Sequence, residues 1–247
     1  MLGGQRFSTH SYRTLGDEAV AYYKFDEGSG AVVNDTWGSN NGSIVNGSWT
    51  ASGMLNSAIY LPAGIDSYVN IPASSTFDPT PELTIMAWVK LDSVVSRQTL
   101  ITEAWGSCCH YDKMVAIEAG RIYFYACARA SACGGTAGET NSLIGITAGK
   151  WHHIAVTAKE GQRPNFYIDG ILRNDSSSTI QYSVVDKHSG QKVTIGAMPP
   201  AGGTGTYLQR LAGYIDEFGV YKKSFGLAQI QEYYAITAPK YGIAVNK

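Results

Sequence analysis

Hydrophobic and polar side chains alternate with a period of two along most of this chain. Eleven segments show the alternation, with glycine, asparagine, serine or proline near their ends. These segments are residues 20–26, 57–62, 67–72, 83–91, 98–105, 113–119, 120–126, 152–158, 165–170, 192–197 and 213–221. A period of two is typical of strands that bury one face. The pattern therefore predicts an all-β fold of two packed antiparallel sheets.

One segment shows the period of a helix instead. Within residues 227–234, the apolar side chains of Leu227, Ile230, Tyr233 and Tyr234 fall on one face. Ser224 precedes them as a candidate N-cap. We therefore expect one short helix after the last strand.

The two ends of the chain lack a clear period. Residues 1–19 are expected to form a tail or tether, and residues 237–247 a second tail. The remaining residues 20–236 are expected to form one domain, a size that single β-sandwiches reach. No internal repeat is visible, which argues against a solenoid or propeller.

Two turns predict hairpins with a defined register. Gly120 and the Asp169-Gly170 pair can adopt the positive φ that a tight hairpin turn requires. If residues 119 and 120 form the first loop, Glu118 faces Arg121 and Cys127 faces residue 112.

Composition excludes several classes of protein. The chain has 247 residues, 44% of them hydrophobic, which is enough to form a core without help from a metal. Its formal net charge is -1 without a run of either sign, so no nucleic-acid or anionic-membrane surface is predicted. No 18-residue apolar run and no signal peptide occur, so no direct membrane insertion is expected. The chain is then either intracellular or separated from its export segment.

Four cysteines favour an exported protein. Cys108, Cys109, Cys127 and Cys133 are close in sequence, and an even local set is typical of one or two disulfides in an oxidising compartment. A zinc site is less favoured, because the vicinal pair cannot easily place both sulfurs on one tetrahedral ion. We therefore expect an extracellular or cell-surface location.

Six motifs follow one another in a characteristic order, at residues 21–43, 51–72, 83–91, 149–158, 165–174 and 213–234. This order resembles the laminin G-like, concanavalin A-like jelly-roll family. The resemblance implies a sandwich of two curved antiparallel sheets that recognises carbohydrate or protein. The region from Trp105 to Ser142 has no counterpart in the family pattern, and loops of this kind are where function usually differs.

The resemblance also implies a structural calcium ion. Related glucan-hydrolysing jelly rolls hold calcium with an aspartate of the final strand, which corresponds to Asp216. Asp26 and Asp66 are additional candidate oxygen donors from the first and second motifs, since calcium takes six to eight oxygen ligands. The alternative is that Asp216 only caps or pairs with a neighbouring strand.

Aromatic residues are candidates for ligand contact. In residues 121–126, alternation directs Ile122 and Phe124 toward the core, and Tyr123 and Tyr125 toward the other face. Tyrosine rings and hydroxyls suit a sugar ring and its polar edge. The alternative is that both tyrosines simply cover the sheet beneath loops.

Further candidates surround the cysteines or lie in glycine-rich loops. Loops stapled by disulfides and rich in such side chains have the composition of a rigid binding site, or they pack around the disulfide. The ligand-binding candidates are Trp105, His110, Tyr111 and Arg129, with Tyr207 and Trp37 as weaker ones.

The sequence does not predict an enzyme. Hydrolytic jelly rolls need two carboxyl groups on one face about 5–5.5 Å apart, and no E-x-D-x-E pattern occurs. Asp216 and Glu217 are adjacent, so alternation should place them on opposite faces. His152 and His153 lie within a strand without a nucleophile elbow, one expected to be packed and the other exposed.

The expected function is therefore a non-catalytic, lectin-like or adhesin-like module that binds a glycan or a surface receptor. It could be part of a larger surface assembly. One alternative is a structural module of a surface appendage, such as a pilin-like filament subunit. A polysaccharide-degrading enzyme is a further alternative.

Overall fold

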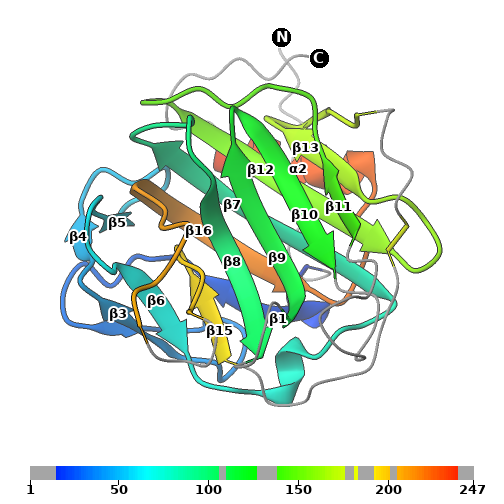
Figure 1. The fold of residues 1–247 in the computed structure, drawn as a ribbon. Coiled ribbons are helices and arrows are strands. Elements are labelled where there is room, and N and C mark those ends of the chain that lie inside the picture. Colours follow the sequence, from blue (N-terminus) through cyan, green and yellow to red (C-terminus); the bar gives the residue numbers. More distant parts are fainter. Residues whose placement is uncertain are drawn as a thin grey trace, which may run out of the picture.

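The protein forms two packed antiparallel sheets in the computed structural model (Figure 1). The structure describes residues 15–105, 110–126, 138–175, 181–182, 192–200 and 205–238, with only the backbone described at 104–105, 110–112, 126 and 138. The predicted all-β jelly-roll sandwich with one short C-terminal helix is confirmed. No helix within the described ranges is long and apolar enough to cross a membrane.

The first sheet has the strand order β14-β13-β12-β7-β16-β5-β4, and β1 pairs with β16 beside this row. Its strands are β1 (Ala19–Tyr23), β4 (Ser48–Thr50), β5 (Ala58–Leu61), β7 (Glu82–Leu91), β12 (Trp151–Lys159), β13 (Asn165–Ile168), β14 (Ile171–Leu172) and β16 (Gly213–Tyr221). The long strands β7, β12 and β16 form its centre.

The second sheet has the order β11-β10-β9-β8-β15-β6-β3-β2. Its strands are β2 (Val32–Val33), β3 (Gly42–Val45), β6 (Tyr68–Ile71), β8 (Gln98–Trp105), β9 (His110–Glu118), β10 (Arg121–Ala126), β11 (Gly138–Asn141) and β15 (Lys192–Ile195). A short 3-10 helix, η1 (Ser75–Phe77), precedes β7.

The core lies between the two sheets and follows directly from the alternation. Ile85 and Val156 come from the first sheet, and Val115 and Phe124 from the second; all are at most 2% exposed and belong to one cluster. The same alternation sends the intervening side chains to the outer faces. Each sheet therefore has an outer face, which is either covered by other parts of the chain or exposed to solvent.

Helix α2 (Leu227–Thr237) covers part of the outer face of the first sheet. Its Ile230 and Tyr233 are buried against Met86 and Tyr167. In Figure 1, α2 lies behind the first sheet, while the outer face of the second sheet points toward the reader. No helix in the described part of the chain packs on that second face.

All eleven predicted strands are present, and the described residues form five more that were not predicted. The missed strands β2, β3, β4, β11 and β14 have two to four residues each, too few to establish a period. The predicted helix is also present but extends to Thr237. Its cap is Gly226, whose N–H donates to Gln229 Oε1 at 3.0 Å, so the Ser224 prediction is wrong. Leu227 is 43% exposed and not part of the buried face.

Packing extends beyond the predicted limits of 20–236. Leu15 is buried in the cluster of Tyr22 and Ile230. Ala238, the residue after α2, is buried beside Trp88. Residues on both sides of the predicted domain thus contribute to its outer clusters.

Candidate functional site

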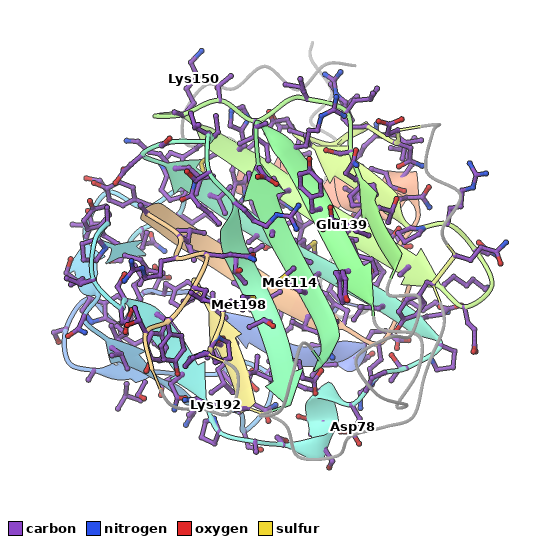
Figure 2. The ribbon with its side chains drawn as sticks, in the orientation of Figure 1. Asp78, Met114, Glu139, Lys150, Lys192 and Met198 are labelled. Carbon is purple, nitrogen blue, oxygen red and sulfur yellow. The ribbon has the colours of Figure 1, made fainter. Side chains whose placement is uncertain are left out.

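The outer face of the second sheet carries a cluster of half-buried tyrosines and buried methionines. Tyr123 and Tyr125 of β10 pack against Met114 and Ala116 of β9 and against Met198. Ile122 and Phe124, their neighbours in sequence, are buried in the core as predicted. In Figure 2, Glu139, Met114, Met198 and Lys192 follow one another across this face. Both tyrosines thus pack against these side chains and remain partly exposed to solvent.

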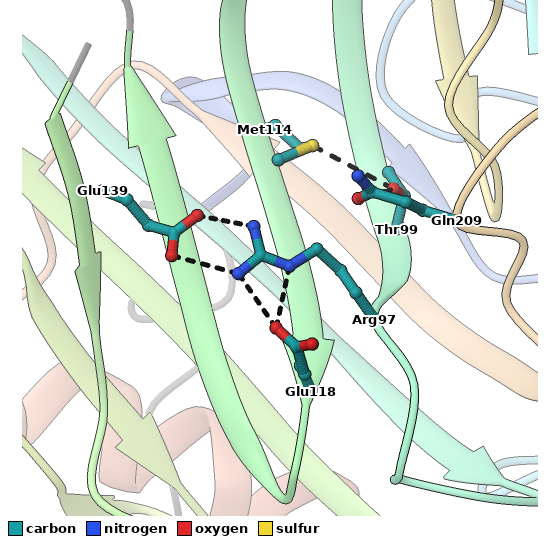
Figure 3. A network of polar contacts seen from close by, with 6 residues as sticks. All are labelled: Arg97, Thr99, Met114, Glu118, Glu139 and Gln209. Atoms are coloured by element: carbon teal, nitrogen blue, oxygen red, sulfur yellow. Dashed lines mark hydrogen bonds and ion pairs between the residues drawn. The ribbon is translucent and has the colours of Figure 1, made fainter. Parts of the chain in front are cut away.

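Arg97, just before β8, joins three strands of this face through its guanidinium group (Figure 3). Its Nη1 and Nη2 donate to the two oxygens of Glu139 at 2.5 and 3.0 Å, and its Nε donates to Glu118 Oε2 at 2.9 Å. The guanidinium carbon lies 4.5 Å from the ring centre of Tyr123. Hydrogen bonds to Glu139, followed by those to Glu118, raise the pKa of Arg97, so it stays charged. We call Arg97, Glu118, Glu139, Tyr123 and Tyr125 the Arg97–tyrosine cluster.

The hairpin between β9 and β10 sets this arrangement. Glu118 pairs with Arg121 across the two-residue loop, as the turn predicted, and Tyr123 and Tyr125 pair with Ala116 and Met114. Directly opposed residues in an antiparallel pair share a face. The register therefore places Glu118 and both tyrosines on the same outer surface.

Residues from the 205–210 segment lie beside the cluster. Thr99 donates through Oγ1 to Gln209 Oε1 at 3.4 Å and lies 4.0 Å from Met114 Sδ (Figure 3). The Thr99 N–H donates to the Gln209 carbonyl at 2.6 Å, and Met198 and Leu208 form a two-way backbone bridge. This segment is therefore held against the sheet.

A second aromatic pair lies on the β6 side of the same sheet. Tyr207 stacks on Tyr68 with 4.1 Å between ring centres, and Lys192 Nζ donates to the Tyr207 hydroxyl at 2.9 Å. Burial, followed by the hydrogen bond with Tyr207, raises the pKa of Tyr68 to about 12. The Tyr207 ring is thus stacked on Tyr68, and the role of Tyr207 in ligand contact stays a prediction.

The predicted candidates around the cysteines are described only in part. Trp105 and His110 pair opposite each other at the ends of β8 and β9, and Tyr111 pairs with residue 104, but their side chains lie outside the description. Arg129 and all four cysteines, Cys108, Cys109, Cys127 and Cys133, also lie outside the described residues. The predictions made for them stay predictions.

The prediction that Asp216 and Glu217 lie on opposite faces is wrong. Asp216 pairs with Trp88, but the next pair joins Gly219 to Met86, so β16 has one residue more than β7 here. This β-bulge has Glu217 at its centre with a φ of 50°. The extra residue cancels the alternation, so Glu217 lies on the same side of the sheet as Asp216, which is the side that α2 partly covers.

Each of these carboxyl groups is buried with its own partners. Asp216 accepts hydrogen bonds from the N–H groups of Leu55 and Glu217, both at 2.8 Å. Glu217 accepts one from the hydroxyl of Tyr22, and its carbonyl accepts one from Tyr233 at 3.2 Å. Burial raises the pKa of each group to about 8. Glu217 lies beneath α2, and Asp216 lies beneath the 53–57 turn. Their exposed fractions are 2% and 0%, so neither carboxyl is accessible to a polymeric substrate.

The predicted calcium ligands are brought together only in part. Asp26 accepts hydrogen bonds from Ser57 N–H and Asn56 Nδ2, both at 3.0 Å, so it holds the same turn as Asp216. Its negative charge adds to the effect of burial on the pKa of Asp216. Asp66 instead forms an ion pair with Arg210 at 3.0 Å. Among the described residues, no group of three or more His, Cys, Asp or Glu side chains is arranged to hold a metal.

Both histidines of β12 are buried, which corrects the prediction that one is exposed. His152 Nδ1 lies 2.8 Å from Asp169 Oδ2, and its Nε2 lies 2.9 Å from Thr147 Oγ1. His153 is fully buried beside Trp88. Trp37, a weaker ligand candidate, is half-buried and stacks on Tyr22 with 4.3 Å between ring centres. These contacts assign His152 and His153 to packing, whereas the role of the half-buried Trp37 in ligand contact stays a prediction.

Comparison with known families identifies the scaffold. The model of the concanavalin A-like lectin/glucanases superfamily matches residues 63–231, more than half of the chain. The chain belongs to this superfamily. A search of curated protein sequences found no significant match.

Three solved structures with the same fold carry a ligand or partner. Domain 4 of an extracellular arabinanase from Geobacillus stearothermophilus, solved with arabinotriose, has a TM-score of 0.62 and 16% identity, over 86% of this chain and 96% of that one. The binding domain of botulinum neurotoxin DC, solved with SialylT, has a TM-score of 0.63 and 13% identity, over 90% of this chain and 52% of that one. The same toxin domain, solved with rat synaptotagmin II, has a TM-score of 0.63 and 12% identity, over 90% of this chain and 52% of that one. The chain spans about half the length of the toxin domains.

The sequence did not predict Arg97 and Glu139 as parts of the site. They are separated by 42 positions and come from a loop before β8 and from the four-residue strand β11. No spacing rule links such residues, because only the strand order β11-β10-β9-β8 brings them together. Glu118 was recognised at the hairpin, but only as a partner of Arg121.

Proposed function

We propose that this chain is a non-catalytic carbohydrate-binding module whose ligand lies on the Arg97–tyrosine cluster. The observation that carries the proposal is the contrast between the two outer faces. One is partly covered by α2, whereas the other presents half-exposed tyrosines beside a fixed Arg–Glu network. Flat rings next to oriented hydrogen-bonding groups are suited to sugars, whose rings have apolar faces and polar edges.

The neighbours of known structure support a glycan before a protein partner. The arabinanase domain matches over nearly its whole length and was solved with arabinotriose. A protein receptor is the second candidate, because the toxin domain was also solved with synaptotagmin II. That match covers only about half of the toxin domain, so the glycan is the stronger proposal.

The proposal of no catalysis rests on the carboxyl groups. A retaining glycosidase needs two accessible carboxyls about 5–5.5 Å apart. On the proposed face, the Glu118 and Glu139 carboxylates are both hydrogen-bonded to the same guanidinium, so neither is free to flank a glycosidic bond as a catalytic carboxyl. Reducing-sugar release from polysaccharides should therefore stay at the level of a blank reaction.

A glycan array followed by calorimetry tests the binding proposal. Tyr123→Ala and Tyr125→Ala should each weaken binding of the array hits by about tenfold or more. Tyr60→Ala is the matched control, because Tyr60 is a half-buried tyrosine of the first sheet whose hydroxyl bonds to Asp92. Equal losses in all three variants, or binding unchanged by the first two, would reject this face as the site.

We also propose that Asp26 and Asp216 contribute to a structural calcium site near the 53–57 turn. Two carboxylates that hold one turn, one of them buried with a raised pKa, form an oxygen-rich setting in which a cation would stabilise the ionised forms. Calcium should raise the melting temperature of the wild type and not of Asp216→Asn. Asp66→Asn serves as the control, and an unchanged wild-type melting temperature would reject the site.

Finally, we propose that the module acts outside the cell, with its cysteines oxidised. The four cysteines and the extracellular arabinanase relative support this setting. Mass spectrometry of the natively produced protein, alkylated without reduction, should find two or four of the thiols blocked from labelling, as one or two disulfides would leave them. Four labelled thiols would contradict it.

A further inference from the structure

The charge balance around Tyr123 bears on the class of sugar that can bind there. Arg97 makes four hydrogen-bond or ion-pair contacts with carboxylate oxygens, two to Glu139 and two to Glu118. A guanidinium has five N–H donors, and a carboxylate ligand is best bound by two of them side by side. Arg97 therefore has no such pair left for an acidic sugar.

The second arginine at this end of the sheet is also paired. Arg121 Nη1 lies 3.3 Å from Asp175 Oδ2 and donates to the Ser142 carbonyl at 2.9 Å. Lys113 of β9 points inward and forms a buried ion pair with Glu103 at 2.5 Å. The guanidinium groups of Arg97 and Arg121 are thus in contact with three carboxylates, those of Glu118, Glu139 and Asp175.

The same groups favour hydroxyl donors. Glu118 and Glu139 are each about one third exposed and can accept additional hydrogen bonds, since a carboxylate has about four acceptor positions. Sugar hydroxyl groups can donate to these oxygens while the ring lies near the tyrosines. A sugar carboxylate would bring further acceptors and a like charge, which is unfavourable at short range.

We infer that the Arg97–tyrosine cluster selects uncharged, polyhydroxylated sugar units and disfavours uronic or sialic acids at that position. This inference rests on the proposed function, since it specifies the ligand of the same site. Lys192, the cation on the β6 side, is bonded to Tyr207 and belongs to the other aromatic pair.

Binding of matched neutral and acidic oligosaccharides tests the inference. Suitable pairs are galactotriose with trigalacturonate and lactose with sialyllactose, measured by calorimetry at low ionic strength, where charge effects are largest. Within a pair that binds, the neutral member should bind about tenfold more tightly. In the Glu118→Gln/Glu139→Gln variant, which keeps polar side chains of the same shape, this ratio should fall toward one.

Asp92→Asn is the matched control, because it removes one negative charge near Tyr60 on the first sheet. It should leave the ratio unchanged. Tighter binding of the acidic members by the wild type, or a ratio unaffected by the glutamine variant, would overturn the inference while the proposed function stands. Absence of binding by every neutral and acidic glycan on an array would instead reject the proposed function and the inference with it.

Discussion

At the scale of single residues, His153 gives the clearest expectation for the effect of pH. It is fully buried beside Trp88 and Tyr234, and neither ring nitrogen has a hydrogen-bond partner among the described residues. Burial lowers its pKa from 6.5 to about 4, an effect that Asp169 opposes in part. The unfolded chain therefore binds this proton more readily than the folded one between those values.

Stability should consequently be lost as the pH falls from about 6.5 to 4. From the shift in its pKa, the titration of His153 should lower the free energy of unfolding by about 3 kcal/mol over this range. His153→Phe keeps an aromatic ring without a titrating group, so its free energy of unfolding should fall less over this range. Urea denaturation at pH 7 and pH 4.5 measures the difference, and equal losses in both proteins would contradict the assignment.

Glu217 gives the opposite dependence. Burial raises its pKa from 4.5 to about 8, so the folded state holds a proton that the unfolded state releases. Its stabilising contribution is present below pH 4.5 and is lost as the pH rises through 8. Between pH 6 and 9, Glu217→Gln should lose less stability than the wild type, by roughly 2–4 kcal/mol. Identical melting-temperature shifts in the two proteins would show that Glu217 does not titrate in this way.

At the scale of elements, the turn of the β9–β10 hairpin holds an alanine in a backbone conformation that alanine does not favour. Ala119 and Gly120 both have positive φ, 48° and 72°, as a two-residue turn of this kind requires. Asp169 and Gly170 form the same arrangement with φ of 52° and 73°, and aspartate tolerates it better than alanine. The sequence predicted the role of Gly120 but not the strain at Ala119.

Ala119→Asn should therefore stabilise the protein by about 0.5–1 kcal/mol, because asparagine adopts positive φ more readily than alanine. For a chain of this size, 1 kcal/mol raises the melting temperature by about 2–4 °C. Calorimetry of this variant beside Ala51→Asn, an exposed alanine without a positive φ, checks the prediction. A gain in the control but not at Ala119 would contradict it.

The β16 bulge shows where a strand pattern misleads. Residues 213–221 alternate well enough to predict the strand, and Phe218 and Val220 do share the core side. The added residue at Glu217 cannot be recognised from period two alone, since a bulge shifts the phase without ending the strand. The two carboxyls were consequently separated in the prediction and lie on one side in the structure.

At the scale of the whole molecule, the sandwich has one outer face partly covered by α2 and one on which no described helix packs, and we propose the second as the ligand face. The two packed sheets were predictable because apolar side chains alternate and the motifs follow the order of the superfamily, but the order of the strands within each sheet was not predicted. The site was predictable only at Tyr123 and Tyr125, whose direction follows from alternation. Arg97 and Glu139 depend on strand order and long-range contacts, which no local pattern contains.

The central claim is that a glycan binds on the outer face of the second sheet. A crystal structure of the chain with its best oligosaccharide from the array tests it most directly. The account predicts sugar density over Tyr123 and Tyr125, with a hydroxyl group within hydrogen-bond distance of Glu118 or Glu139. Sugar bound only on the α2 side, or on the first sheet near Tyr60 and Tyr214, would contradict it.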